Sequence, residues 1–276
     1  MIIWLASYPK SGNTWVRSIV SALVYTDDGI FDFSKLSHIK QFPRKIHFDE
    51  FTDEKDNFNE IKKYWIPAQE KLNLDNKVKI FKTHHANIKM ENYAFTNKEN
   101  TLGTIYVVRD PRNVVNSLSN HYGLSLNKAK EFMLRPSVIR ETHVQDKGTL
   151  SPLGTWADNY ISWTHHNSNL LLIKYEDLMT NAKDEITKII NFLKPHIKFN
   201  FDEKKINNII ESTKFDNLKK MEKDGKFNEY NDVEEEYKFN FFNLGPKNKW
   251  QNNLDISIKD EIEKKFSDLM KKLGYL

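Results

Sequence analysis

The sequence predicts an α/β fold in which a central parallel sheet is flanked by helices. A short apolar run at residues 2–6 leads through a loop with proline and glycine into residues 14–23, whose apolar positions have helical spacing. A strand, a glycine loop and a helix in this order open a parallel α/β unit. Three further apolar runs, at residues 78–81, 105–108 and 170–173, have the length and composition of strands buried on both faces.

Three later segments carry signals for the start of a helix. Asp110 is a favourable N-cap, and Pro111 suits the first helical position. Asn181 and Ser257 each precede a run of apolar residues at helical spacing, and Gly274 supplies the stop after the last one. We expect three scaffold helices from these signals.

The composition fits one globular domain over residues 1–276. Charged residues make up 29% of the chain, apolar residues 39% and aromatic residues 13%, which excludes a disordered or fibrous protein. A chain of this length can bury a full core. The polar, weakly periodic stretches at residues 24–77, 119–155 and 222–249 are expected to be connecting and lid segments.

The net charge and the cysteine content exclude several classes of function. The net charge is only +4 and the basic residues are scattered, so we expect no nucleic-acid binding, whereas a small polyanionic ligand suits a basic cleft. The absence of cysteine excludes disulfides, thiol nucleophiles and cysteine zinc sites. The apolar opening at residues 1–6 is too short for a signal peptide or a membrane span. A soluble, cytoplasmic protein without membrane contact is the simplest expectation.

Polar side chains follow each predicted strand. Lys82 and His84 come after the second, Arg109 after the third and Tyr175 after the fourth, while Lys10 lies in the loop after the first. In open parallel sheets, ligands bind beyond the carboxyl ends of the strands. We therefore expect these residues to converge on one crevice.

The loop after the first strand has the features of an anion site. It combines the unpaired N–H groups of a helix N-terminus with a lysine, hydroxyls and a glycine that permits close approach. The candidate ligands are Lys10, Ser11, Gly12, Asn13, Thr14 and Trp15. The nucleotide-kinase P-loop cannot be placed here because the lysine precedes the glycine. Taken alone, the loop fits a plain tight turn equally well.

The segment from Tyr8 to Trp15 resembles the 5'-phosphosulfate loop of the sulfotransferases that use 3'-phosphoadenosine 5'-phosphosulfate, PAPS. A second segment is similar to the family's 3'-phosphate motif, in which Arg109 and Ser117 would hold that phosphate. An arginine at a strand end can also donate two hydrogen bonds to a phosphate on physical grounds. An ion pair that caps the helix is the alternative for Arg109 alone.

Lys82, Thr83 and His84 resemble the family's Lys-Thr-His element, in which the histidine takes the proton of the acceptor. A histidine titrates near neutrality, so it can accept a proton at working pH. Lys82 would stabilise the transferring group. Because adjacent side chains of an extended segment point to opposite faces, only one of His84 and His85 should face the acceptor.

Further matches surround the nucleotide. The resemblance implies that Trp15 and Tyr175 contact the adenine and that Thr213 and Phe215 also touch the nucleotide, although core packing is the alternative for the aromatic residues. It also implies a P-loop-like nucleotide-binding fold, PAPS as the donor, 3',5'-ADP as the product and no metal.

The C-terminal part departs from the family. An Arg-Lys pair that would clamp the 3'-phosphate is replaced by Asn243 and Leu244. Lys247 or Lys249 could substitute as point charges. The family's dimerisation element is not matched at residues 251–260, so the oligomeric state stays open.

The sequence as a whole predicts a sulfotransferase that moves the sulfuryl group of PAPS to a hydroxyl or amine of a small acceptor, with His84 as general base. A P-loop-type kinase or nucleotide hydrolase and a non-catalytic nucleotide-binding protein are the alternatives. The sequence does not identify the acceptor. Aromatic and histidine side chains that could line its pocket, or act as packing anchors, are Phe42, Phe48, Phe51, Tyr64, Trp65, His121 and Tyr122.

Overall fold

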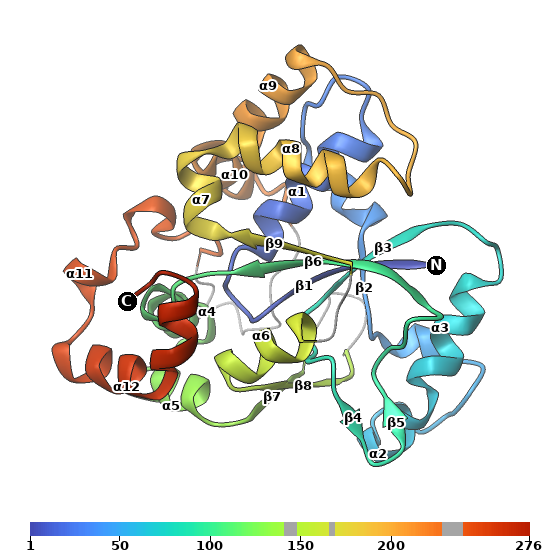
Figure 1. Ribbon diagram of the computed structural model, residues 1–276, viewed down its shortest axis with the longest axis horizontal. Coiled ribbons are helices and arrows are strands. Elements are labelled where there is room, and N and C mark those ends of the chain that lie inside the picture. The colour runs from blue at the N-terminus through green and yellow to red at the C-terminus, as the bar shows by residue number, and fades with distance from the viewer. Residues whose placement is uncertain (141–147, 166–168, 228–239) are drawn as a thin grey trace.

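A five-stranded parallel sheet forms the centre of the computed structural model, which describes residues 1–140, 148–165, 169–227 and 240–276. The strand order is β2-β3-β1-β6-β9, and every neighbouring pair is parallel (Figure 1). The strands are β1 (Ile2–Ser7), β2 (Lys40–Gln41), β3 (Lys79–Thr83), β6 (Thr101–Val108) and β9 (Leu170–Lys174). The predicted α/β fold is confirmed, and the four predicted strands lie where the apolar runs placed them. The fifth, β2, is only two residues long and gave no sequence signal.

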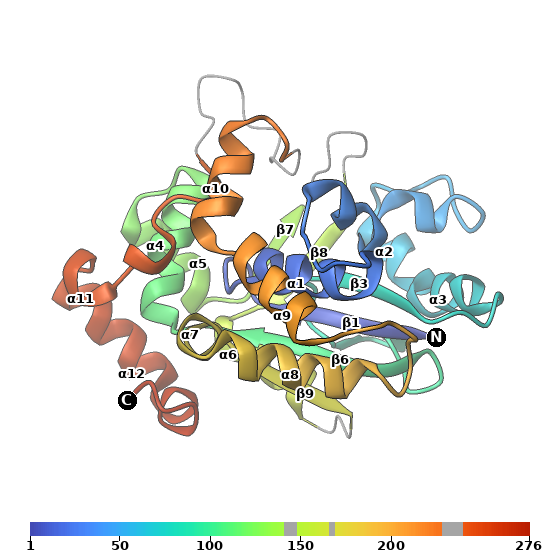
Figure 2. The ribbon, with the colours of Figure 1, turned by 90° about the horizontal axis from the view of Figure 1, so that it is seen from above.

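Helices cover both faces of the sheet (Figures 1 and 2). Successive residues of β1 point to opposite faces and all of them are buried, which explains its uninterrupted apolar run. One face packs against α1 (Asn13–Tyr25), α8 (Ala182–Leu193) and α9 (Glu203–Ser212). The other packs against α3 (Trp65–Asn73), α4 (Pro111–Tyr122), α6 (Trp156–Thr164) and α12 (Ile256–Lys272).

Shorter elements complete the chain. They are the helices α2 (Phe58–Ile61), α5 (Leu126–Leu134), α7 (Tyr175–Thr180), α10 (Phe215–Lys223) and α11 (Trp250–Asn253), and the antiparallel pairs β4 (Lys89–Met90) with β5 (Tyr93–Ala94) and β7 (Ser137–Arg140) with β8 (Leu150–Gly154). None of the helices in the described ranges is long and apolar enough to cross a membrane.

The predicted helix starts are mostly confirmed. The side chain of Asp110 accepts a hydrogen bond from the backbone N–H of Arg112, as expected of an N-cap. The helix α8 follows Asn181 directly. The helix α12 begins earlier than predicted, because Asp255 rather than Ser257 takes the extended conformation of the N-cap. Gly274 follows the end of α12 in the left-handed region, with φ 71°.

The segments expected to be connections hold more regular structure than predicted. Residues 24–77 contain α2 and α3, and residues 119–155 contain α5 and the β7–β8 pair. These elements are short, so each offers too few positions to reveal a period. Of the third segment, residues 228–239 lie outside the described part of the chain.

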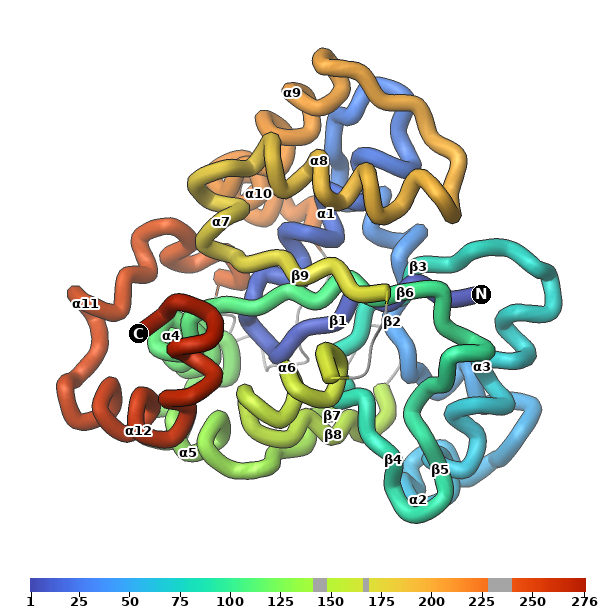
Figure 3. The backbone as a smooth tube through the Cα atoms, viewed as in Figure 1, coloured from blue at the N-terminus to red at the C-terminus, as the bar shows by residue number. Residues whose placement is uncertain are grey.

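The C-terminal segment lies beside α4 (Figure 3), and Arg112 in the first turn of α4 ties the two together. Its guanidinium pairs with Asp110 at 2.6 Å and with Glu263 at 2.7 Å, and it lies 4.0 Å from the ring centre of Trp250. It also donates to the backbone oxygen of Tyr275 at 2.7 Å. This network holds residues 250–275 against α4, beside the strand ends that carry the predicted site.

Candidate functional site

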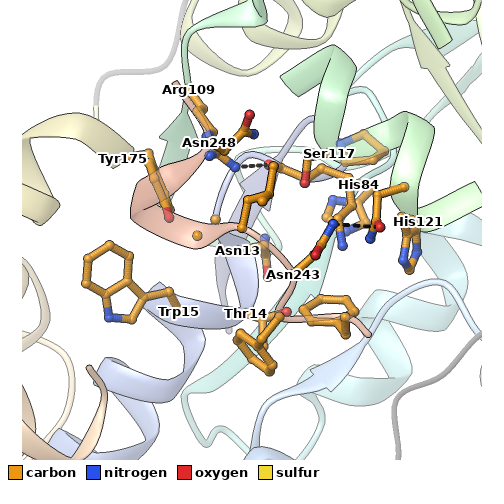
Figure 4. A pocket seen from close by; sticks show the side chains of 18 of the residues that line it. Asn13, Thr14, Trp15, His84, Arg109, Ser117, His121, Tyr175, Asn243 and Asn248 are labelled. Carbon is orange, nitrogen blue, oxygen red and sulfur yellow. Dashed lines mark hydrogen bonds between the residues drawn. The ribbon is translucent and has the colours of Figure 1, made fainter. Parts of the chain in front are cut away.

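A cavity opens at the carboxyl ends of the strands and brings most of the predicted residues together (Figure 4). The cavity is lined by the loop after β1, the ends of β2, β3, β6 and β7, the starts of α7 and α10, one side of α4, residues 241–245 and Asn248. The predicted site residues in its wall are Lys10, Gly12, Asn13, Thr14, Trp15, Lys82, His84, Arg109, Ser117, Tyr175 and Phe215.

Two predicted residues do not line this cavity. Ser11 is fully buried, and within the described part of the chain its hydroxyl oxygen has no hydrogen-bond partner. Thr213 is also buried, and its hydroxyl donates to the carbonyl oxygen of Ile209 at 2.7 Å. Thr213 therefore closes the last turn of α9, whereas Phe215 reaches the cavity.

The loop after β1 is shaped by two left-handed residues. Lys10 has φ 64° and Gly12 has φ 105°. A Cβ atom at Gly12 would lie 2.6 Å from the ring of Tyr175, so only glycine lets the loop approach that ring so closely. No side chain caps the start of α1, and the N–H groups of its first turn have no intrahelical partner. These groups remain available to an anion.

Three cations meet in the cavity wall. Burial, together with the positive charges of Arg109 and Lys82, lowers the pKa of Lys10 to about 7, and Glu222 only partly opposes this. The ammonium of Lys10 lies 3.6 Å from the ring centre of Phe241. The cavity is thus rich in positive charge, which favours an anionic ligand.

Arg109 is held in place by backbone and ring contacts. Its Nη1 donates to the carbonyl oxygen of Lys10 at 3.3 Å, and its guanidinium lies 4.1 Å from the ring centre of Tyr175. Its Nε is buried and has no partner among the described residues. Tyr175 in turn contacts Trp15 edge to face at 5.4 Å, so the three side chains form one connected wall.

His84 has a defined orientation. Its Nδ1 lies 2.8 Å from the carbonyl oxygen of Ser7 and 3.2 Å from the hydroxyl of the same residue. The side chain of Asn13 donates to that hydroxyl at 3.2 Å, and Asn159 donates to the backbone oxygen of His84 at 2.9 Å. The histidine is therefore fixed from both its ring and its backbone.

The neighbouring histidine points to the opposite side, as expected on an extended segment. His85 is fully buried and stacks on Phe95 with ring centres 4.0 Å apart. Burial lowers the pKa of His85 to about 3, which keeps it neutral. His85 thus belongs to the core.

The C-terminal segment contributes amides where the family pattern has cations. Asn243 and Leu244 line the cavity, but neither Lys247 nor Lys249 does. The suggestion that one of these lysines substitutes for the missing pair therefore has no support in the geometry. Instead, the side chain of Asn243 donates to Asn120 at 2.7 Å.

Several cavity residues were missed by sequence reasoning. They are Gln41 at the end of β2, Asn116 and Asn120 on α4, Ile139 and Arg140 on β7, Leu218 on α10, and Phe241, Phe242 and Asn248. The polar face of α4 formed by positions 113, 116, 117, 120 and 121 was a usable signal, because these positions share one side of a helix. Of the aromatic and histidine candidates for the acceptor pocket, only His121 and Tyr122 line it; Phe42, Phe48 and Trp65 are core residues.

Comparison with known proteins decides the family. The pattern of the sulfotransferase domain matches residues 2–274. The chain belongs to the sulfotransferase family. It is 24% identical to Sulfotransferase 1E1 of Cavia porcellus over 271 residues, which cover 97% of this chain and 82% of that protein. It is 25% identical to Sulfotransferase 1E1 of Homo sapiens over 271 residues, or 97% and 83% of the two chains.

Solved structures of other proteins share this fold. Mouse sulfotransferase SULT7A1 complexed with PAP superposes with a TM-score of 0.63 at 21% identity, over 98% of this chain and 84% of that one. Retinol dehydratase in a complex with retinol and PAP gives a TM-score of 0.59 at 19% identity, over 98% and 81%. Membership makes this chain a PAPS-dependent sulfotransferase family enzyme. Within the described ranges, no three His, Asp or Glu side chains are grouped so that they could hold a metal ion.

Proposed function

We propose that residues 1–276 form a single sulfotransferase domain that moves the sulfuryl group of PAPS to a hydroxyl or amine of a small acceptor, with His84 as general base. The observation that carries the proposal is the shared cavity: Lys10, His84 and Arg109 come from three different strand ends and all line it. A common anionic ligand explains why two cations and a fixed imidazole lie at one opening.

The cavity wall fits a nucleotide that carries phosphates at both ends. The uncapped first turn of α1 and the ammonium of Lys10 would hold the 5'-phosphate side. Arg109, whose buried Nε lacks a partner among the described residues, would hold the 3'-phosphate together with Ser117. The Trp15 and Tyr175 rings would flank the adenine. We extend this role to Phe215 but not to Thr213.

His84 is suited to take a proton at Nε2. Because a carbonyl oxygen can only accept, the contact with Ser7 assigns the ring hydrogen to Nδ1 and leaves Nε2 as the base. When bound, PAPS supplies the sulfuryl group, and Lys82 would stabilise the negative charge on its oxygens. The acceptor proton would pass to Nε2 as the acceptor oxygen or nitrogen bonds to sulfur, while the bond from sulfur to the bridging oxygen breaks and 3',5'-ADP leaves with its charge neutralised by Lys10.

The two alternative functions explain fewer of the residues in the cavity. A kinase or nucleotide hydrolase needs the lysine after the last glycine of its loop, and here Lys10 precedes Gly12. A protein that only binds nucleotide would use Lys10 and Arg109 but has no use for a histidine with a fixed, basic Nε2 in the same cavity.

The test measures binding and transfer separately. Isothermal titration with 3',5'-ADP and with 5'-AMP should give tighter binding of 3',5'-ADP, and radiolabelled PAPS should transfer its label to at least one hydroxyl or amine in an acceptor panel. Tight 3',5'-ADP binding without transfer to any acceptor would favour the binding-only alternative. Equal affinity for the two nucleotides would contradict the assignment of the 3'-phosphate site.

A further inference from the structure

The two ends of the cavity differ in character, and the sheet order separates them. The strands β6 and β9, which lead to Arg109 and Tyr175, lie on one side of β1, while β2 and β3, which lead to Gln41 and His84, lie on the other. Figure 4 agrees: His84 and His121 lie together at one side of the cavity, and Trp15 and Tyr175 at the other. If the nucleotide lies by Arg109, as proposed above, the acceptor enters from the β2–β3 side.

The acceptor end carries several polar side chains. Beside His84, its wall includes Gln41, His121 and Arg140, with Ile139 as an apolar contact. The side-chain nitrogen of Gln41 is buried and has no partner among the described residues. Such an end is poorly suited to a purely apolar acceptor, because the side-chain nitrogen of Gln41 would stay without a partner.

A cation with unused donors lies at this end. The Nη1 of Arg140 bonds to Asp56 at 3.0 Å and to the backbone oxygen of Gly148 at 2.9 Å, but its Nη2 and Nε have no hydrogen-bond partner in the described ranges. Asp56 also pairs with Lys45 at 2.7 Å. The carboxylate of Asp56 thus pairs with two cations, Lys45 and Arg140. These three side chains together keep a net positive charge.

This charge is not needed by the nucleotide end, which has Lys10 and Arg109, and Lys82 at the end of β3 is already assigned to the sulfuryl group. None of the residues that line the described cavity is Asp or Glu. PAPS is anionic and would repel an anionic acceptor. A cation that pairs with the charge of the acceptor, away from PAPS, would offset this repulsion. Arg140 ends β7, and the β7–β8 pair is tied to the β2–β3 side, because Thr149 donates to the carbonyl oxygen of Pro43 and the N–H of Ala86 donates to that of Pro152.

Resting on the proposed function, we propose that the acceptor is a hydroxylated carboxylic acid, whose hydroxyl lies at His84 and whose carboxylate pairs with Arg140. Ile139 and Tyr122 would pack against the carbon skeleton between the two groups. Arg140 then acts as a specificity-determining residue that contributes to acceptor binding and not to nucleotide binding.

The test compares each acid with its neutral analogue. With saturating PAPS, we expect wild-type protein to use para-hydroxyphenylacetate, or its homologue with one more methylene, with kcat/KM about 10-fold or more above that for the matching amide. Arg140→Gln should remove this preference by raising KM for the acid, and Arg140→Lys should retain part of it. Asp56→Asn removes the competing carboxylate and should lower KM for the acid.

Binding of 3',5'-ADP separates the possible failures. It should be unchanged in the Arg140 and Asp56 variants, since both residues lie away from the nucleotide end. If the amides are used as well as the acids, if none of the acids is used, or if Arg140→Gln affects acid and amide equally, the acceptor proposal is wrong while the sulfotransferase assignment stands. If wild-type protein does not bind 3',5'-ADP, the proposed function itself is wrong.

Discussion

The Nδ1 of His84 donates to the carbonyl oxygen of Ser7 across 2.8 Å, which links the end of β3 to the end of β1. Ser7 ends β1 and His84 directly follows the neighbouring parallel strand β3, so the pairing of the two strands brings the ring against a carbonyl oxygen, which can only accept. The Nε2 atom is left as the basic nitrogen. The same strand end that carries the anion loop thereby orients the proposed base.

From this relationship we predict that His84→Ala lowers kcat by about 10² to 10⁴, the usual contribution of a general base, and leaves the Kd of 3',5'-ADP nearly unchanged. Turnover at saturating PAPS and titration with 3',5'-ADP check the two parts. The matched control is His121→Gln, which alters the other histidine of the cavity and should retain most of kcat. Unchanged turnover in His84→Ala would rule out the base assignment.

The second prediction concerns Arg109. Because it is proposed to hold the 3'-phosphate, Arg109→Ala should weaken 3',5'-ADP about 10- to 100-fold, the range of a charged hydrogen bond, and should weaken 5'-AMP much less. Arg109→Lys should recover part of the loss, since a lysine keeps the charge without the planar fit.

Lys247→Ala serves as the control for Arg109. That lysine is exposed and does not line the cavity, so its removal should change neither affinity. Equal weakening of both nucleotides by Arg109→Ala would mean that the arginine acts through the loop it touches at Lys10, and the 3'-phosphate role would be lost.

The third prediction follows from the lowered pKa of Lys10. With the pKa near 7, most of this side chain is neutral at pH 8 before ligand arrives. A bound phosphate raises the pKa again, so 3',5'-ADP binding should take up close to one proton at pH 8 and much less at pH 6. Calorimetry in buffers of different ionisation enthalpy measures this number. Lys10→Met should abolish the uptake at pH 8; an uptake that persists would place the titrating group elsewhere.

Sequence reasoning was most successful where a structural requirement dictates the residue types of a short segment. The strand at Ile2–Ser7 is apolar because both sheet faces are covered, and the loop after it needs a glycine because Gly12 approaches the ring of Tyr175. Although Tyr175 lies far along the chain, both signals, the apolar run and the glycine, stand within the first 12 residues. They could therefore be predicted without knowing what packs against them.

The residues that were missed depend on contacts between distant segments. Gln41 enters the cavity because β2 adds to the edge of the sheet beside β3, and a strand of two residues has no period to detect. Asn243 and Asn120 meet only because the C-terminal segment returns to α4. Arg112 carries an ion-pair network that no motif announced, since its partner Glu263 lies 151 positions further on.

The last prediction concerns acid stability, and two histidines, the partly buried His47 and the fully buried His85, determine its sign. The pKa of His47 and that of His85 are each lowered by burial to about 3, whereas an unfolded histidine titrates near 6.5. The Nδ1 of His47 accepts from the backbone N–H of Arg44, and the Nε2 of His85 is buried without a partner among the described residues. Protonation would break the first contact and bury an unpaired charge at the second.

Between pH 6.5 and about 3, the unfolded chain therefore binds more protons than the folded one, so stability falls as the pH falls. Each histidine contributes up to about 1.4 kcal/mol per pH unit in this window and nothing above it. Urea unfolding at pH 7 and pH 5 measures the loss before most carboxylates titrate. His85→Phe keeps a ring against Phe95 but cannot be protonated, so it should show a smaller loss over this range than wild type. An unfolding free energy that stays constant from pH 7 to pH 5 in wild type would contradict the assignment of both histidines as neutral in the folded protein.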